Sequence, residues 1–269
     1  MELSFFQISF LAILQGITEF LPISSSGHLL LPGELWGWPD QGLVFDVAVH
    51  IGSLLAVVYY FRQALQTLIS AWFVSLRGKG HSESSRLAWL LLMATVPAGL
   101  SGLLLNDWVE SYARSMVVIG CTSILFGALL WWADRSGRRL LGLHQLGWRS
   151  ALLIGMAQVL ALIPGTSRSG ITMTAALAVN LSREAAARFS FLLAIPIIAA
   201  SGLLKTVELV QLGASPDQWI TLLYGVLLSA LVSFACIHYF LRLIERIGFL
   251  PFVLYRMVLG VMLLVLHFV

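Results

Sequence analysis

Charged residues are scarce in this sequence. Asp, Glu, Lys and Arg make up 11% of its 269 residues, whereas soluble globular domains carry about 25%. Hydrophobic residues account for 59%, and the mean hydropathy is +0.90. This balance excludes an ordinary soluble domain and predicts an all-α, polytopic integral membrane protein, because apolar helices of about 20 residues cross the hydrocarbon of a bilayer.

Cysteine and net charge are also low. The two cysteines, Cys121 and Cys236, lie singly in apolar segments, which indicates membrane packing and neither a disulfide framework nor a metal site. The formal net charge is only +3 and lies in loops, so we expect no nucleic-acid partner. The first 20 residues lack a basic region and a small-residue cleavage site, so they do not resemble a removable signal peptide.

Six apolar segments are long enough to be full membrane spans. They lie at about 42–61, 87–105, 115–133, 188–204, 219–241 and 251–269. The intervening segments 62–86 and 134–149 carry an excess of Arg and Lys and are expected in the cytoplasm, whereas 106–114 and 205–218 lack this excess and are expected outside.

Two further apolar regions, 5–41 and 150–187, are broken in the middle by Pro, Gly and Ser, in LPISSSG and in IPGTSRSG. The expected sides of the loops require the first region to end outside and the second to begin and end in the cytoplasm. A helical hairpin that enters the membrane and returns on the same side satisfies both requirements. The sequence therefore predicts about six full spans plus two re-entrant helical hairpins.

The two broken regions match each other at a constant offset of 143 residues. The matched pairs are Gln15 with Gln158, Ser24 with Ser167, Ser26 with Ser169 and Gly27 with Gly170, while Ser25 falls on Arg168. Since the two hairpins enter from opposite sides, this pattern is typical of an inverted-topology repeat, whose discontinuous helices meet near the midplane of the bilayer. We expect one membrane domain over 1–269, with a first repeat at 5–133 and a second at 150–269.

The polar groups of the two breaks indicate an anion site with groups for proton transfer. An arginine at membrane depth, such as Arg168, is costly unless it meets an anion, and its planar fork suits phosphate oxygens. The alternative interpretation is that Arg168 only pairs with Glu19 and holds the hairpins together. Glu19 and His28 are candidate proton donors and acceptors. The nearby serines are candidate nucleophiles or phosphate ligands, and helix capping is the structural alternative.

A second polar pair, Asp46 and His50, lies four residues apart near the start of a predicted span. Residues at this spacing share one face of a helix. The pair has two interpretations that the sequence leaves open: support of the site from behind, or an ordinary polar contact between helices.

Two motifs carry a resemblance to a known family. EFLPISSSGH together with PGTSRSG, in a chain of this length and hydropathy, resembles the bacitracin-resistance family of undecaprenyl-diphosphate phosphatases. The likeness extends to FDVAVHIGSLLAV at 45–57, LSREAAARFSFLLAIP at 181–196 and YRMVLG at 255–260. The resemblance implies an enzyme that removes the terminal phosphate of a C55 isoprenoid diphosphate and so recycles the lipid carrier for cell-wall synthesis.

The resemblance also implies the site residues. The acidic motif of the family matches Gln15 and Glu19, its serine and histidine match Ser25 and His28, and its arginine matches Arg168. Many members carry glutamate at the position of Gln15, so this departure favours Glu19 as the sole acid and base. We therefore expect Glu19, Ser25, His28 and Arg168 to be catalytic, with Ser25 attacking the phosphorus or orienting a water. The expected substrate-binding residues are Gln15, Ser24, Ser26, Gly27, Thr166, Ser167, Ser169 and Gly170.

Cofactor, partner and location follow from the same resemblance. Members of the family depend on Mg²⁺ or Ca²⁺, and this sequence offers only Glu19 near the site, so we expect the diphosphate itself to hold most of the ion. The expected partners are the polyprenyl diphosphate and membrane lipids, and a homodimer is left open. The expected location is the bacterial cytoplasmic (inner) membrane, with the site opening toward the periplasmic face.

A transporter or flippase of a phosphorylated isoprenoid lipid is the main alternative, since broken helices in inverted repeats are typical of transporters. A carrier needs binding groups but no nucleophile or base. The combination of SSSGH with Glu19 therefore favours an enzyme. A purely structural subunit would leave Arg168 and Glu19 without a purpose.

Overall fold

A computed structural model describes residues 3–78, 80, 82–112, 115–212 and 216–268. Throughout these residues the chain is helical, with a single isolated β-bridge between Leu141 and Leu181. The α-helices are α1 (Phe5–Thr18), α2 (Ser25–Trp36), α3 (Gly42–Tyr60), α4 (Arg62–Leu76), α5 (Glu83–Tyr112), α6 (Met116–Ser136), α7 (Trp148–Val159), α8 (Arg168–Ala178), α9 (Arg183–Leu212), α10 (Pro216–Ile247) and α11 (Leu250–Phe268). Two short 3-10 helices, η1 (Leu143–Gln145) and η2 (Leu160–Leu162), flank α7.

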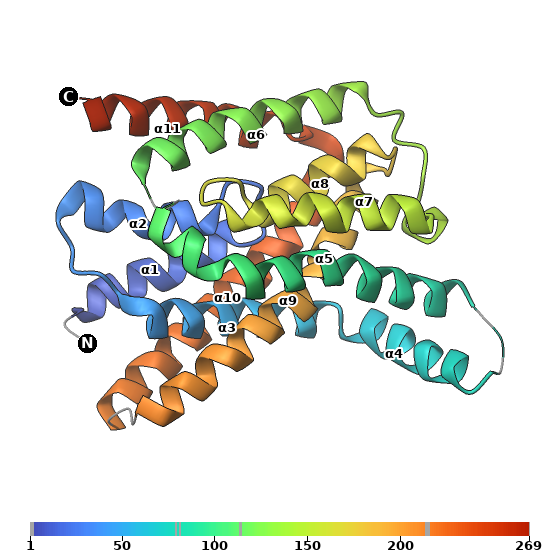
Figure 1. The fold of residues 1–269 in the computed structure, drawn as a ribbon, viewed down its shortest axis with the longest axis horizontal. Helices are drawn as coiled ribbons and strands as arrows, with labels where there is room; N and C mark the ends of the chain where they lie inside the picture. The colour runs from blue at the N-terminus through green and yellow to red at the C-terminus, as the bar shows by residue number, and fades with distance from the viewer. Residues whose placement is uncertain (1–2, 79, 81, 113–114, 213–215, 269) are drawn as a thin grey trace.

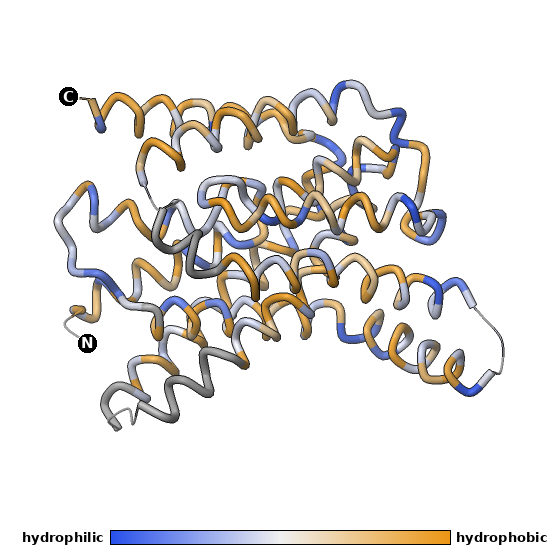
Figure 2. The backbone as a smooth tube through the Cα atoms, viewed as in Figure 1, coloured by the Kyte–Doolittle hydropathy of each residue, from blue (hydrophilic) through white to orange (hydrophobic). Residues whose placement is uncertain are grey.

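The long helices confirm a polytopic all-α membrane protein. Among the described residues, 5 helices (α5, α6, α9, α10 and α11) are long and apolar enough to cross a membrane, and the bent pair α3–α4 brings the number to 6. Figure 2 shows hydrophobic residues along most of the length of the helices and hydrophilic residues mainly at helix ends and in loops. Outward-facing side chains such as Leu104 (82% exposed) and Leu231 (69% exposed) are consistent with contact to lipid.

The predicted cytoplasmic loop at 62–86 is wrong in its first part, because residues 62–76 form helix α4. The chain bends by 78° between α3 and α4, and α4 extends to one side of the molecule beside α5 (Figure 1). Its sequence RQALQTLISAWFVSL repeats apolar residues at helical spacing, with Leu68 buried and Phe73 exposed. The basic residues counted for the loop flank this amphipathic helix and conceal it in a simple charge count.

The expected outer loops are also shorter than predicted, because residues 106–112 continue α5 and residues 205–212 continue α9. The side chains of 106–114 and 205–218, on which the outward assignment depends, lie outside the described part of the chain.

The two interrupted regions each form a hairpin of short helices. Helices α1 and α2 have 14 and 12 residues, and α7 and α8 have 12 and 11. At about 1.5 Å per residue none of them reaches the ~30 Å thickness of the hydrocarbon. The two loops at the hairpin tips meet near the centre of the molecule (Figure 1), where hydrogen bonds join them.

The two hairpins share an unusual local conformation at the matched serines. Ser24 and Ser167 are the N-caps of α2 and α8, with φ/ψ of 74°/92° and 71°/111°. The surroundings of the two hairpins correspond as well. Helix α1 of the first predicted repeat packs against α10 of the second, and α7 of the second packs against α5 of the first. The division into repeats at 5–133 and 150–269 stays a prediction, and these two correspondences are what favour it.

Small residues bring the helices around the first hairpin close together. A Cβ added to Gly16 on α1 would lie 2.7 Å from the Cβ of Val232 on α10. Beside this crossing, the Ser53 hydroxyl lies 3.0 Å from the Ser233 hydroxyl and 3.3 Å from that of Ser229. Close backbone approach and hydroxyl contacts are typical of helix packing in membranes. They hold α1, and therefore the first tip, against the rest of the bundle.

Candidate active site

Glu19, at the C-terminal end of α1, is the centre of the contacts between the hairpins. It is 7% exposed. Its Oε2 accepts hydrogen bonds from Ser25 Oγ at 2.6 Å and from Gln15 Nε2 at 2.9 Å, and its Oε1 accepts one from Arg168 NH2 at 2.7 Å. Three of the four residues predicted to be catalytic, Glu19, Ser25 and Arg168, are therefore in direct contact.

The local sequence explains this geometry. Gln15 and Glu19 lie four residues apart on α1, hence on one face of the helix. Ser24 then takes a left-handed conformation that L-residues rarely adopt, at a cost of about 1–3 kcal/mol. Ser25 follows as the first residue of α2, and its hydroxyl turns back to Glu19. The strained serine thus allows α2 to start beside the end of α1.

The second tip places Arg168 opposite Glu19. Ser167 caps α8, with its Oγ accepting a hydrogen bond from the Gly170 backbone N–H at 3.1 Å. Ser169 donates from Oγ to the backbone carbonyl of Leu21 in the first tip at 2.8 Å. Arg168 is the first residue of the helix, and its guanidinium also donates to the Ser190 carbonyl on α9 at 3.4 Å. The ion pair with Glu19, weighed in the sequence as an alternative to anion binding, is present.

The predicted substrate-binding residues differ in their access to the outside. Ser26 is exposed. The others are buried in the hairpins: Gln15, Ser24, Gly27, Thr166, Ser167, Ser169 and Gly170. The hydroxyl of Thr166 has no hydrogen-bond partner among the described residues. Most of the predicted substrate-binding residues are therefore enclosed within the hairpins, and Ser26 is the exposed member of the set.

His28, the fourth residue predicted to be catalytic, lies one turn further along α2. Its Nδ1 lies 2.6 Å from the Ser24 carbonyl and its Nε2 lies 2.6 Å from the hydroxyl of Tyr255 on α11. The two rings stack with centroids 5.5 Å apart. Both ring nitrogens are therefore engaged, and His28 fixes the backbone immediately before Ser25.

His50 on α3 joins the site, which resolves an alternative that the sequence left open. Its Nε2 lies 3.4 Å from Glu19 Oε2, and its Nδ1 lies 2.6 Å from the Asp46 backbone carbonyl. The Asp46 carboxylate accepts a hydrogen bond from Gln41 Nε2 at 3.0 Å. A small cavity of about 60 Å³ lies beside these residues, with Ser26 and Pro164 in its lining. The pair thus supports Glu19 from the side of α3.

Arg256 on α11 is a residue of the site that the sequence interpretation missed. Its side chain is fully buried, at 0% exposure. It donates hydrogen bonds to the Pro22 carbonyl in the first tip and to the Gly165 carbonyl in the second. A charged residue in the middle of the predicted span 251–269 was the available signal, because such a residue is a functional candidate by default.

The described residues do not form a closed metal site. They contain no group of three or more His, Cys, Asp and Glu side chains placed to hold an ion. Both oxygens of Glu19 are occupied by Ser25, Gln15 and Arg168. The donor set therefore does not fit a divalent cation held by the protein alone.

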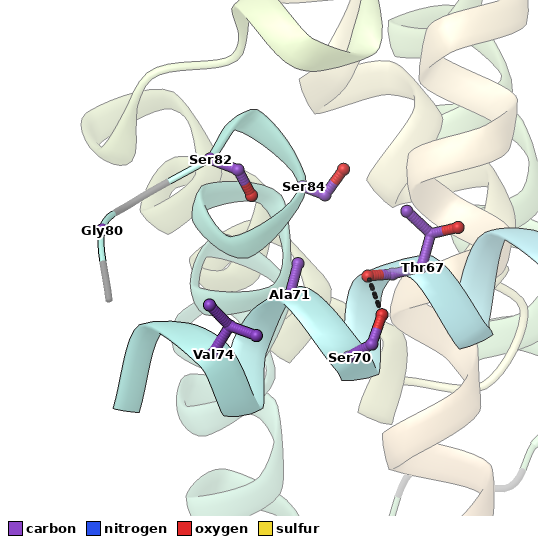
Figure 3. A pocket seen from close by; sticks show the side chains of 7 residues that line it. All are labelled: Thr67, Ser70, Ala71, Val74, Gly80, Ser82 and Ser84. Atoms are coloured by element: carbon purple, nitrogen blue, oxygen red, sulfur yellow. Dashed lines mark hydrogen bonds between the residues drawn. The ribbon is translucent and has the colours of Figure 1, made fainter. Parts of the chain in front are cut away.

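A larger pocket lies between α4 and the start of α5, away from the tips (Figure 3). It has a volume of about 430 Å³ and is lined by Thr67, Ser70, Ala71, Val74, Gly80, Ser82 and Ser84. Figure 3 draws the hydroxyl groups of the pocket, and none of these lining residues has a charged side chain. The described lining of this pocket therefore offers no positive charge to a phosphorylated ligand, whereas the hairpin tips offer Arg168.

Comparisons with known proteins place these features in one family. A family model described as bacitracin resistance protein BacA matches residues 8–262. The chain is 55% identical over 263 residues to undecaprenyl-diphosphatase 1 of Pseudoalteromonas translucida, covering 98% of each chain. It is 54% identical over 264 residues to an undecaprenyl-diphosphatase of Hahella chejuensis, again with 98% of each chain covered. An undecaprenyl-diphosphatase of Alteromonas mediterranea is 55% identical over 262 residues, covering 97% of this chain and 98% of the relative.

Proposed function

The chain belongs to the bacitracin resistance protein BacA family, and on that premise we propose that it hydrolyses undecaprenyl diphosphate to undecaprenyl phosphate and inorganic phosphate. The three relatives named above are undecaprenyl-diphosphatases, and they match nearly the whole chain. The enzyme recycles the lipid carrier for cell-wall synthesis, which accounts for bacitracin resistance.

One observation carries this function to specific residues: the Ser25 hydroxyl donates to Glu19 Oε2 at 2.6 Å while Arg168 holds Oε1 of the same carboxylate at 2.7 Å. A nucleophile in hydrogen-bond contact with a base that a third group orients is the general arrangement of activated nucleophiles. A transporter of the same lipid requires no such pair.

The terminal phosphate binds between the two tips. Arg168 provides a fork of N–H donors at the first turn of α8, where the helix dipole also favours an anion. Ser26 is exposed, lines the small cavity beside His50 and supplies a further hydroxyl. Phosphoryl transfer depends mostly on positioning and on neutralising charge, so this placement of Arg168 accounts for much of the rate.

In the chemical step, Ser25 Oγ attacks the terminal phosphorus and its proton passes to Glu19. The bond between the bridging oxygen and the terminal phosphorus breaks, undecaprenyl phosphate leaves with the bridging oxygen, and a phosphoserine remains. Glu19 gives that proton to the departing undecaprenyl phosphate and is ionised again. It then takes a proton from a water molecule that attacks the phosphoserine, and it passes this proton to Ser25 Oγ as the Oγ–phosphorus bond breaks and inorganic phosphate leaves. Positioned acid–base catalysis of this kind contributes about 10²–10⁴-fold.

The surrounding residues orient this pair. Gln15 donates to Glu19 Oε2, His50 lies beside the same oxygen, and His28 holds the Ser24 carbonyl directly before Ser25. In this proposal His28 orients Ser25 through the backbone.

A divalent cation, Mg²⁺ or Ca²⁺, would be held mainly by the substrate diphosphate. Hard cations are often bound through substrate phosphates. The cation would supply positive charge to the diphosphate. The residues of the chain bind and orient the substrate and transfer the proton.

The protein resides in the bacterial inner membrane, and the site opens toward the periplasmic face. The two hairpins enter the membrane from opposite sides as parts of inverted repeats. The short lengths of their helices and the matched conformations of Ser24 and Ser167 support this arrangement. The isoprenoid chain of the substrate remains in the bilayer beside the exposed apolar surface of the helices.

The test is phosphate release from undecaprenyl diphosphate by the purified protein in detergent, with Mg²⁺ or Ca²⁺ and with EDTA. Cation-dependent release is expected from the wild type, with a loss of about 10²–10³-fold in Glu19→Gln and in Arg168→Ala variants that retain the wild-type unfolding temperature. A folded wild type that releases no phosphate under any of these ions contradicts the proposal, and lipid transport in liposomes then tests the alternative.

A further inference from the structure

Arg256 is a cation buried at the point where three parts of the chain meet. Its guanidinium donates to four backbone carbonyls: Pro22 at 3.2 Å, Gly165 at 2.9 Å, Thr122 at 3.3 Å and Ser123 at 3.2 Å. Pro22 lies in the first tip, Gly165 in the second, and Thr122 and Ser123 on α6. One side chain therefore binds both tips and the helix behind them.

The charge of Arg256 faces backbone carbonyl oxygens. Within the described ranges, no Asp or Glu side chain forms an ion pair with it. A buried arginine that meets only carbonyl dipoles keeps its full positive charge in a medium of low dielectric constant, where its field is weakly screened.

This charge lies against the N-terminus of α8. A Cβ added to Gly170, two residues after Arg168, would lie 2.8 Å from Arg256 NH1. Glycine allows this close approach, because a side chain at position 170 would require the Arg256 guanidinium to shift. The same helix turn presents Arg168 to the proposed diphosphate position, so Arg256 stands behind the anion site and Arg168 in front of it.

Given the proposed phosphatase function, we propose that Arg256 is a positioning residue with two roles: it fixes the two tips in register, and its uncompensated charge strengthens diphosphate binding from behind. Loss of the fork mainly displaces the tips and lowers kcat. Loss of the charge weakens the affinity for the diphosphate group.

The two roles are separable with Arg256→Lys, which keeps the charge but offers fewer donors in a different geometry, and Arg256→Gln, which removes the charge. The control is Arg246→Gln, which removes an exposed arginine from the last turn of α10. Each protein is tested for its unfolding temperature, for kcat and KM with undecaprenyl diphosphate, and for calorimetric binding of inorganic pyrophosphate.

We expect kcat to fall about 100-fold in both Arg256 variants, because small displacements of a reacting group have effects of this size. The dissociation constant of pyrophosphate should stay near the wild-type value in Arg256→Lys and rise about tenfold in Arg256→Gln. Arg246→Gln should match the wild type in every measurement.

If Arg256→Gln folds and keeps both the wild-type kcat and the wild-type affinity for pyrophosphate, the inference is overturned. If Arg256→Gln does not fold, a wild-type kcat in Arg256→Lys overturns it. An equal loss of pyrophosphate affinity in both variants would remove the charge role. If the wild type binds pyrophosphate but releases no phosphate from the lipid, the phosphatase proposal fails, and the binding measurements still decide whether the charge of Arg256 contributes.

Discussion

Glu19 receives hydrogen bonds from residues on both hairpins, and this single side chain defines the site at the residue scale. Ser25 and Gln15 reach it from the first hairpin and Arg168 from the second. A buried carboxylate is costly unless such partners satisfy it. The partners are the same groups that the proposed reaction uses, so the contacts that stabilise Glu19 also orient it as a base.

The hydroxyl of Tyr255 provides a residue-scale test of the role of His28. Tyr255→Phe removes the hydrogen bond to His28 Nε2 but keeps the stacked ring. We expect kcat to fall about tenfold with little change in KM, since a hydrogen bond of this kind contributes on the order of 1 kcal/mol.

The matched control is Tyr224→Phe. The hydroxyl of Tyr224 lies 3.0 Å from that of Ser9, outside the tips. Steady-state kinetics on both variants give the comparison. Equal activity in the two variants would show that the His28–Tyr255 contact does not orient the site.

The site residues were partly predictable from the sequence. EFLPISSSGH and SRSG contain Glu19, Ser25, His28 and Arg168, and these residues were predicted because polar groups are conspicuous in apolar segments. The burial of Ser24, Ser169 and Thr166 was not predictable, because the same hydroxyl serves equally well as a ligand or as an internal hydrogen-bond partner. Arg256 lies far along the chain from both tips, and only the packing of α11 brings it between them.

At the scale of elements, each hairpin tip depends on a few backbone positions that only certain residues tolerate. Gly165 in the second tip has φ of +85°, and a Cβ there would lie 2.7 Å from the Ile119 carbonyl oxygen. Glycine satisfies both the conformation and the close approach to α6. The absence of a side chain at Gly165 therefore allows the second tip to pack closely against α6.

Gly165→Ala should displace the second tip and with it Arg168. We expect activity to fall more than about 100-fold, as for other displacements of a reacting group, together with a lower unfolding temperature. Gly37→Ala is the matched control, because Gly37 also has a positive φ, +65°, but nothing within 4 Å of an added Cβ. Its cost should be limited to backbone strain of about 1 kcal/mol. If the two variants lose comparable activity, backbone strain alone explains the effect and the close contact with α6 does not matter.

Helix α4 shows where prediction of the elements failed. The sequence indicated a cytoplasmic loop because charges were counted over the whole segment 62–86, and the helical spacing of apolar residues within it was not used. The short helices of the hairpins were predicted correctly, since Pro, Gly and Ser interrupted apolar runs that were otherwise long enough to span.

The whole molecule is a bundle of membrane helices with the two tips at its centre (Figure 1). Composition alone predicted this class, because a soluble domain cannot expose so many apolar residues on its surface. The side of the membrane to which the site opens depends on loop charges, and part of those charges lie outside the described residues.

Thiol labelling in intact cells tests the proposed orientation. In a background without Cys121 and Cys236, a cysteine replacing Asp40, between α2 and α3, should react with a membrane-impermeant reagent. A cysteine replacing Ser82, between α4 and α5, should react only after the cells are made permeable. The reverse pattern would contradict a periplasmic opening.

The central claim is that Glu19 activates Ser25 for attack on the terminal phosphorus. The most direct measurement is rapid quenching of the enzyme with undecaprenyl diphosphate labelled on the terminal phosphate, followed by identification of the labelled residue. We expect a phosphoserine at Ser25 in the wild type and in Ser26→Ala, and none in Ser25→Ala. Label on another residue, or phosphate release near the wild-type rate by Ser25→Ala, would contradict it.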